Sequence, residues 1–262
     1  MNLLRRLFFN NESSSAVPEK IEIFSRHCIF SSISSHKKRF PGFSREACYR
    51  NLIETLDPNK TNLTFWLDTA HGTIEDHFLK DEKRYPVLSV QEGSEAGSFL
   101  SLLDYLERNP LDPNTIVYLV EDDYLHRPGW TDVLLEAFQL PGIDYATLYD
   151  HKDKYFFPEY KKLNSQIFIT PSCHWRTAPS TTHTFAVRYK TLQKHMAIHR
   201  RFSKGRKISA DHQKFCHLQK KGATLISSIP AWSTHAEPEF ASPCIDWQTI
   251  LTSNTESTSC PM

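Results

Sequence analysis

The chain lacks an excess of either charge, a long apolar run and a regular cysteine pattern. Among its 262 residues, Lys and Arg number 31 and Asp and Glu number 30, so no global field draws the protein to nucleic acid. No stretch approaches the roughly 20 consecutive apolar residues of a membrane span. We therefore expect no membrane span and no nucleic-acid partner, and a ligand that is recognised at a defined site.

The six cysteines show neither the paired short spacings of a zinc site nor the density of a disulfide scaffold. We interpret them as buried thiols in a reducing compartment, which predicts a cytoplasmic protein. The N-terminal run Met1–Phe9 is too short for a secretory signal and is interrupted by Arg5 and Arg6. This run either packs on the domain or makes peripheral contact with a membrane.

The composition is that of a globular protein, because 39% apolar and 12% aromatic residues are enough for a sizeable core. A Ser-rich joint at residues 13–15 and a Ser- and Thr-rich segment after Pro243 mark its limits. We predict an N-terminal extension over residues 1–17, one domain over residues 18–240 and a mobile tail over residues 241–262.

Strand-like and helix-like segments alternate in the first half, which predicts an α/β/α sandwich with a mostly parallel central sheet. The strand-like segments are 21–24, 62–68, 86–90 and 115–120, and the helix-like ones are 44–56 and 92–106. In the second half, the strand-like segments 166–170 and 182–188 flank a predicted loop that contains Trp175. These two strands predict a smaller antiparallel excursion.

Three carboxylates, Glu121, Asp122 and Asp123, follow the buried strand 115–120 directly. Because clustered carboxylates repel one another, a divalent cation held by oxygen ligands would stabilise them. The alternative is that they are solvated turn residues or the first turn of a helix. Asp68 also follows a strand, and ligands of parallel sheets bind beyond the carboxyl ends of the strands, which favours the metal-site hypothesis.

The chain resembles the GT-A glycosyltransferases, nucleotide-sugar-dependent enzymes with a DXD-type metal motif. The resemblance lies in the order of an apolar strand with Glu121-Asp122-Asp123, a late Asp211 at the head of a helix, and Ser233-Thr234-His235 after the last strand. The triplet is most similar to the Glu-Asp-Asp variant of the N-acetylglucosaminyltransferase I type and more loosely to family 2 enzymes. The resemblance covers residues 18–237 and rests on short motifs.

The resemblance implies a role for each acidic residue of the triplet. Asp123 would bind Mn²⁺ or Mg²⁺ directly, and His235 would complete the metal shell. Glu121 and Asp122 would contact the ribose, the sugar or metal-bound water, and Asp68 would lie near the nucleotide base. Apart from the resemblance, His235 is equally well interpreted as an ordinary loop histidine.

The resemblance also implies that Asp211 is the catalytic base of an inverting reaction. Two features depart from the family pattern: the glycine-rich acceptor loop is replaced by residues 179–184, and Ala210 stands where an acidic residue usually precedes the base. Asp211 also fits a simple helix N-cap.

The expected activity is metal-dependent, inverting transfer of a sugar from a UDP- or GDP-linked donor to a hydroxyl group of a glycan or glycoconjugate. A nucleotidyltransferase or phosphohydrolase is one alternative, and its two-metal chemistry would need a second carboxylate cluster, for which Asp68 with Asp150 is the candidate pair. A non-catalytic nucleotide-sugar-binding module is the other, and Asp211 would be dispensable in it.

Overall fold

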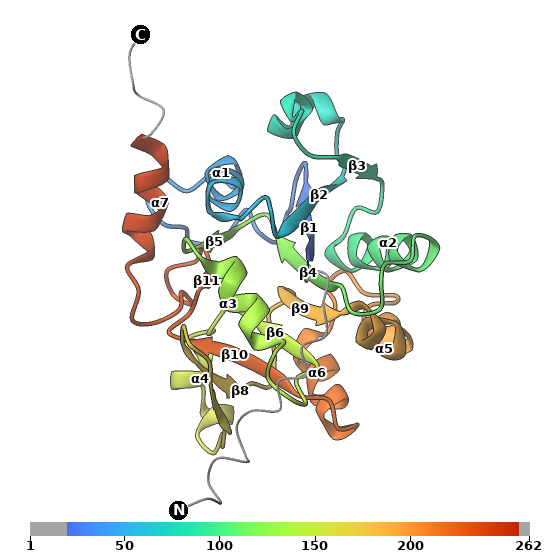
Figure 1. Cartoon of the computed structure of the whole chain (residues 1–262). Coiled ribbons are helices and arrows are strands. Elements are labelled where there is room, and N and C mark those ends of the chain that lie inside the picture. The colour runs from blue at the N-terminus through green and yellow to red at the C-terminus, as the bar shows by residue number, and fades with distance from the viewer. Residues whose placement is uncertain (1–19, 257–262) are drawn as a thin grey trace, which may run out of the picture.

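A computed structural model describes residues 20–256, and the predicted extension over residues 1–17 lies outside them. Two sheets and the helices around them make up the fold (Figure 1). The strands are β1 (Ile21–Cys28), β2 (Thr61–Asp68), β3 (Val87–Val90), β4 (Ile116–Glu121), β5 (Tyr124–His126), β6 (Tyr145–Thr147), β7 (Ile167–Ile169), β8 (His174–Thr177), β9 (Phe185–Arg188), β10 (Leu225–Ile229) and β11 (Ser233–His235). The helices are α1 (Arg45–Thr55), α2 (Glu95–Arg108), α3 (Trp130–Ala137), α4 (Asp153–Phe156), α5 (Tyr189–Arg201), α6 (Asp211–Lys220) and α7 (Trp247–Glu256), with short 3-10 helices η2 (Ile74–Asp76), η3 (Phe78–Asp81) and η4 (Pro158–Tyr160).

The large sheet has the strand order β3-β2-β1-β4-β9-β6-β10-β8-β7. β9 and β8 run opposite to the other strands of this sheet, so the predicted mostly parallel α/β sheet is confirmed. The chain moves outward from β1 to β2 and β3, and then returns to the other side of β1 as β4. The carboxyl ends of β1 and β4 therefore flank the point where the strand order reverses, which is where open α/β sheets bind ligands.

Helices cover both faces of this sheet, because alternate side chains of β4 point to opposite faces and are apolar on both. Ile116, Tyr118 and Val120 pack with α1 and α3 on one face, whereas Val117 and Leu119 pack with α2, α5 and α6 on the other. A strand buried on both faces reads as a continuous apolar run. That run in residues 116–120 is what identified the strand in the sequence.

The antiparallel excursion differs from the expected pairing. β7 pairs with β8 at the edge of the sheet, while β9 lies inside the sheet between β4 and β6. The predicted loop around Trp175 is thus strand β8, in which Trp175 is fully buried. Only one of its four side chains is buried, which leaves too short a pattern for recognition from sequence.

The segment after residue 240 was expected to be a mobile tail, and the structure corrects this for residues 247–256. They form α7, which lies beside α1 (Figure 1). Trp247 and Leu251 are buried against Ala47, Cys48 and Leu125. The two apolar residues stand four positions apart on one helical face, which, with the partly buried Ile250, stabilises a helix whose remaining residues are polar. The remaining domain boundaries stay predictions.

Candidate functional site

A cavity of about 480 Å³ lies at the carboxyl ends of β1, β2 and β4. Five of the six residues predicted for the site line it, and they come from β2, from the end of β4 with the turn after it, and from β11: Asp68, Glu121, Asp122, Asp123 and His235. The volume is within the range of small-molecule sites, about 300–1,000 Å³. The structure therefore brings together residues up to 167 positions apart, at the reversal point of the sheet.

The acidic triplet is neutralised by arginines, one for each carboxylate. Arg26 donates to Glu121 over 3.2 Å, and Arg39 donates to Asp123 Oδ2 over 2.8 Å. Arg45 Nε lies 2.9 Å from Asp122 Oδ2 as an ion pair without hydrogen-bond geometry. The carboxylates thus need no metal ion to balance their charge. These arginines are site residues that the sequence reasoning missed.

Arg26 is the only one of the three with a visible sequence signal. It is 5% exposed and lies in β1, where the polar run Ser25-Arg26-His27 interrupts an otherwise apolar strand. Its second branch donates to Glu95 over 3.0 Å. Burial lowers the pKa of Arg26, but Glu95 and Glu121 raise it further, so the guanidinium stays charged. A charged residue within a buried strand was the available pointer to this cluster.

Burial and neighbours separate the pKa values of the triplet. Burial raises the pKa of Asp122 to about 7, against the opposing effect of Arg45, and burial also raises the pKa of Glu121. Burial acts in the same direction on Asp123, but His235 and Arg39 outweigh it and hold the pKa of Asp123 below its ordinary value. Asp123 is therefore the firmly ionised member of the three.

His235 lies on β11, which pairs with β5 and so places it beside the triplet: His235 is the partner of Tyr124. Its Nε2 contacts Asp123 Oδ2 at 2.9 Å and its Nδ1 lies 3.1 Å from Glu237. Burial lowers the pKa of His235, but Asp123 and Glu237 raise it to about 9. His235 therefore has both nitrogens engaged by carboxylates and is charged near neutral pH.

Asp68 has a local role at the edge of the cavity. Its Oδ1 accepts hydrogen bonds from the backbone N–H groups of Ala70 and Glu92, both over 3.0 Å. These bonds join the segments that follow β2 and β3. One oxygen of Asp68 is thus used to fix the wall of the cavity, while the residue itself lines it.

Asp211 does not line the cavity, unlike the other five predicted residues. It is the first residue of α6, and Ala210 is the N-cap, so the expected capping role is not observed. Its carboxylate instead accepts hydrogen bonds from the backbone N–H groups of Thr181 and Thr182, over 3.0 and 2.9 Å. Thr182 lines the cavity, and Asp211 lies behind it.

Comparison with known proteins identifies no family. No protein-family model matches the chain, and no curated protein matches it. Among solved structures it is similar to 4-diphosphocytidyl-2C-methyl-D-erythritol synthase from Anaerococcus prevotii DSM 20548, with 9% identity and a TM-score of 0.45, over 92% of this chain and 99% of that one. A likeness this low carries no conclusion about function. Within residues 20–256, no helix is long and apolar enough to cross a bilayer.

Proposed function

We propose that the protein transfers a sugar from a nucleoside-diphosphate sugar to a hydroxyl group, with a divalent metal ion bound at Asp123. The observation that carries this proposal is the convergence of Asp68, the triplet and His235 on one cavity at the reversal point of the sheet. The resemblance to GT-A glycosyltransferases orders these residues in the same way. Glu121 and Asp122 would face the donor, as that resemblance implies.

The lining of the cavity suits such a donor. Lys207 supplies positive charge, which a diphosphate requires, and Lys37 and Arg45 are cations on the same lining that also pair with Glu237 and Asp122. Phe30 and Ile33 are exposed large apolar residues on the same lining, with 53% and 48% of their surface accessible. Apolar side chains beside charged groups are the usual mixture in sites that bind a nucleotide base or a sugar face.

One observation at Asp123 supports the proposed divalent ion. Asp123 Oδ1 is buried and has no hydrogen-bond partner in the described part of the chain, so one carboxylate oxygen is left for a ligand. Oxygen ligands suit Mg²⁺ or Mn²⁺, and the imidazole of His235 would favour Mn²⁺. His235 would join Asp123 as a ligand after losing the proton on Nε2. Such an ion supplies positive charge against the leaving diphosphate.

The alternative function, a nucleotidyltransferase or phosphohydrolase with two metal ions, needs a second carboxylate cluster, and Asp68 with Asp150 was the candidate pair. Asp150 does not line the cavity; it pairs with Arg176 over 2.5 Å and accepts a hydrogen bond from Tyr155. Asp68 and Asp150 therefore do not form a second carboxylate site. Measuring turnover distinguishes the other alternative, a non-catalytic binding module, because such a module would bind the donor without transferring the sugar.

The test is to incubate the protein with Mn²⁺ and UDP- or GDP-linked sugars and to measure binding by calorimetry and slow release of nucleoside diphosphate. We expect both with at least one donor, and loss of both in Asp123→Ala. Asp132→Ala is the matched control, because Asp132 is an exposed acid on α3 that contacts Lys60. Binding without release in the presence of acceptors supports a binding module, and no binding of any donor rejects the proposal.

A further inference from the structure

The turn that carries Thr182 and His183 into the cavity has an unusual backbone. Thr182 has φ 54° and His183 has φ 62°, both in the left-handed region that favours glycine. A β-branched residue such as Thr182 rarely adopts it. Such conformations persist where the surroundings impose them, and they cluster at functional sites. The contacts that impose this turn therefore bear on what the cavity does.

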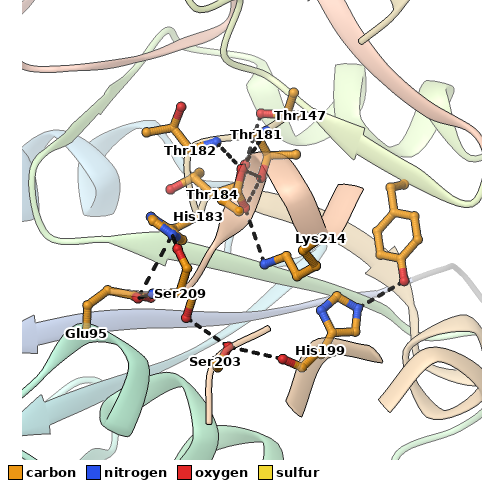
Figure 2. A network of polar contacts seen from close by, with 12 residues as sticks. Glu95, Thr147, Thr181, Thr182, His183, Thr184, His199, Ser203, Ser209 and Lys214 are labelled. Carbon is orange, nitrogen blue, oxygen red and sulfur yellow. Dashed lines mark hydrogen bonds and ion pairs between the residues drawn. The ribbon is translucent and has the colours of Figure 1, made fainter. Parts of the chain in front are cut away.

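Asp211 supplies the main contacts that hold the turn. Figure 2 shows Thr181, Thr182 and Lys214 around these contacts. Its Oδ2 accepts the N–H groups of Thr181 and Thr182, and its Oδ1 accepts the Thr181 hydroxyl over 3.1 Å. Lys214 lies 3.3 Å from Asp211 Oδ1, and both side chains are buried, at 1% and 6% exposure. Tyr124 adds a hydrogen bond to the Thr182 carbonyl over 2.9 Å. The carboxylate of Asp211 is thereby committed to the backbone of this turn.

The turn presents His183 to the cavity in one defined orientation. Its Nε2 contacts the Ser209 carbonyl oxygen at 2.9 Å, and because a carbonyl only accepts, the proton of the neutral ring lies on Nε2. Nδ1 is then the nitrogen that can accept a proton. Glu95 Oε2 lies 3.9 Å from Nε2 and accepts the Ser209 N–H over 2.7 Å, as Figure 2 shows for Glu95, His183 and Ser209.

We infer that His183 is the general base of the transfer and that Asp211 is a positioning residue that acts through it; this inference rests on the proposed function. The proton of the acceptor hydroxyl passes to Nδ1 of His183. The acceptor oxygen forms a bond to the anomeric carbon, and the bond from that carbon to the diphosphate oxygen breaks, so the diphosphate leaves with the electron pair. Burial and the nearby Lys214 lower the pKa of His183, but the carboxylates of Glu95, Asp211 and Glu121 outweigh them, raise this pKa and so stabilise the resulting imidazolium.

The first test is His183→Gly, because glycine accepts the φ of this position and leaves room for a free imidazole. We expect turnover to fall about 10²- to 10⁴-fold, the usual contribution of a general base, while donor binding is retained. Added imidazole should restore part of the turnover. His212→Ala is the control, since His212 lies outside the cavity and contacts Tyr160. Undiminished turnover in His183→Gly would overturn the assignment.

The second test separates positioning from direct catalysis by a double-mutant cycle. Asp211→Asn should lower turnover in the parent chain but add no further loss in the His183→Gly background. Losses that multiply would overturn the positioning role and point to Asp211 itself as the base. If Asp211→Asn proves unstable, Thr181→Val removes only the hydroxyl contact and takes its place.

A readout independent of activity is the ¹⁵N NMR spectrum of the His183 ring, assigned by its loss in His183→Gly. The parent chain should show the Nε2–H tautomer, and Asp211→Asn should show a mixture. An unchanged tautomer in Asp211→Asn would overturn the positioning role. If the parent chain binds no nucleotide sugar, the proposed function fails and the base assignment falls with it, whereas the tautomer still decides the positioning.

Discussion

At the scale of single residues, Arg26 is a charged side chain that is almost completely buried. It is the buried partner of both Glu95 and Glu121, and so links α2 to the end of β4. His183 also faces both carboxylates, but the ion pair of Arg26 with Glu95 is the shorter one, at 3.0 Å against 3.9 Å. Breaking a buried ion pair by removing one partner is costly, because the remaining charge is left without compensation.

We therefore expect Arg26→Met to lower the free energy of unfolding by about 3–5 kcal/mol, measured by urea denaturation at neutral pH. Arg200→Met is the matched control, because Arg200 also contacts two acids, Asp104 and Glu107, but on the surface. It should cost less than about 1 kcal/mol. Equal losses of unfolding free energy in the two variants would contradict the view that the buried ion pairs of Arg26 with Glu95 and Glu121 stabilise the fold more than surface pairs do.

Asp211 gives stability a defined dependence on pH. Burial raises its pKa, but Lys214, His183 and the Thr181 N–H together lower it below the ordinary value near 4. The unfolded chain then takes up this proton at a higher pH than the folded one. The stability that the ionised group contributes is fully present above about pH 4 and is lost as the pH falls below it.

The measurement is the unfolding free energy of the parent chain and of Asp211→Asn from pH 6 down to pH 2. The difference between the two should be constant above pH 4 and should shrink below it. A difference that does not change with pH would show that Asp211 has an ordinary pKa in the folded protein.

Sequence reasoning at this scale found acids but not the bases that accompany them. Glu121 to Asp123 were recognisable because three charges follow an apolar strand. Arg39 pairs with Asp123 from 84 positions away, in a loop rich in Ser, Lys and Arg that has no recognisable motif. The position of His183 depends on two left-handed residues that no sequence rule assigns to Thr and His. Such partners become visible only once the fold brings them together.

At the scale of elements, long segments with a clear period were predicted and short ones were not. α1 with its Ser44 cap and α2 have helical spacing of apolar residues, and β4 is a continuous apolar run, which is enough to identify them. β8 and α7 do not, since each rests on one or two large buried side chains. Tertiary contacts decide the structure of such segments, and local sequence carries little of that information.

The packing of α7 can be tested through Trp247, which is buried and donates to the Ser242 carbonyl over 2.9 Å. Trp247→Ala should lower the unfolding free energy by about 3–5 kcal/mol, the usual cost of removing a large core side chain. Ser253→Ala, on the exposed side of the same helix, should change it by less than about 0.5 kcal/mol. Equal changes of unfolding free energy in the two variants, measured by urea denaturation, would contradict the packing of α7 and favour a loosely attached tail.

At the scale of the whole molecule, ligand binding should stabilise the entire domain. A donor nucleotide with Mn²⁺ at about 100 times its dissociation constant adds about 2.7 kcal/mol to the folded state. For a chain of this size that predicts a rise in Tm of roughly 5–10 °C, read by differential scanning fluorimetry. Asp123→Ala should abolish the rise and Asp132→Ala should keep it. A rise that survives in Asp123→Ala would place the ligand elsewhere.

The small sheet of β5 and β11 has a consequence for the order in which the protein matures on the ribosome. β5 follows the acidic triplet, but its partner β11 is synthesised about a hundred residues later, and their pairing sets His235 opposite Tyr124. A nascent chain that has reached α5 already holds the residues of β1 to β4, yet it has no β11. The arrangement around Asp123 can therefore form only after β11 has been synthesised, so a shorter nascent chain would lack the contact between His235 and Asp123.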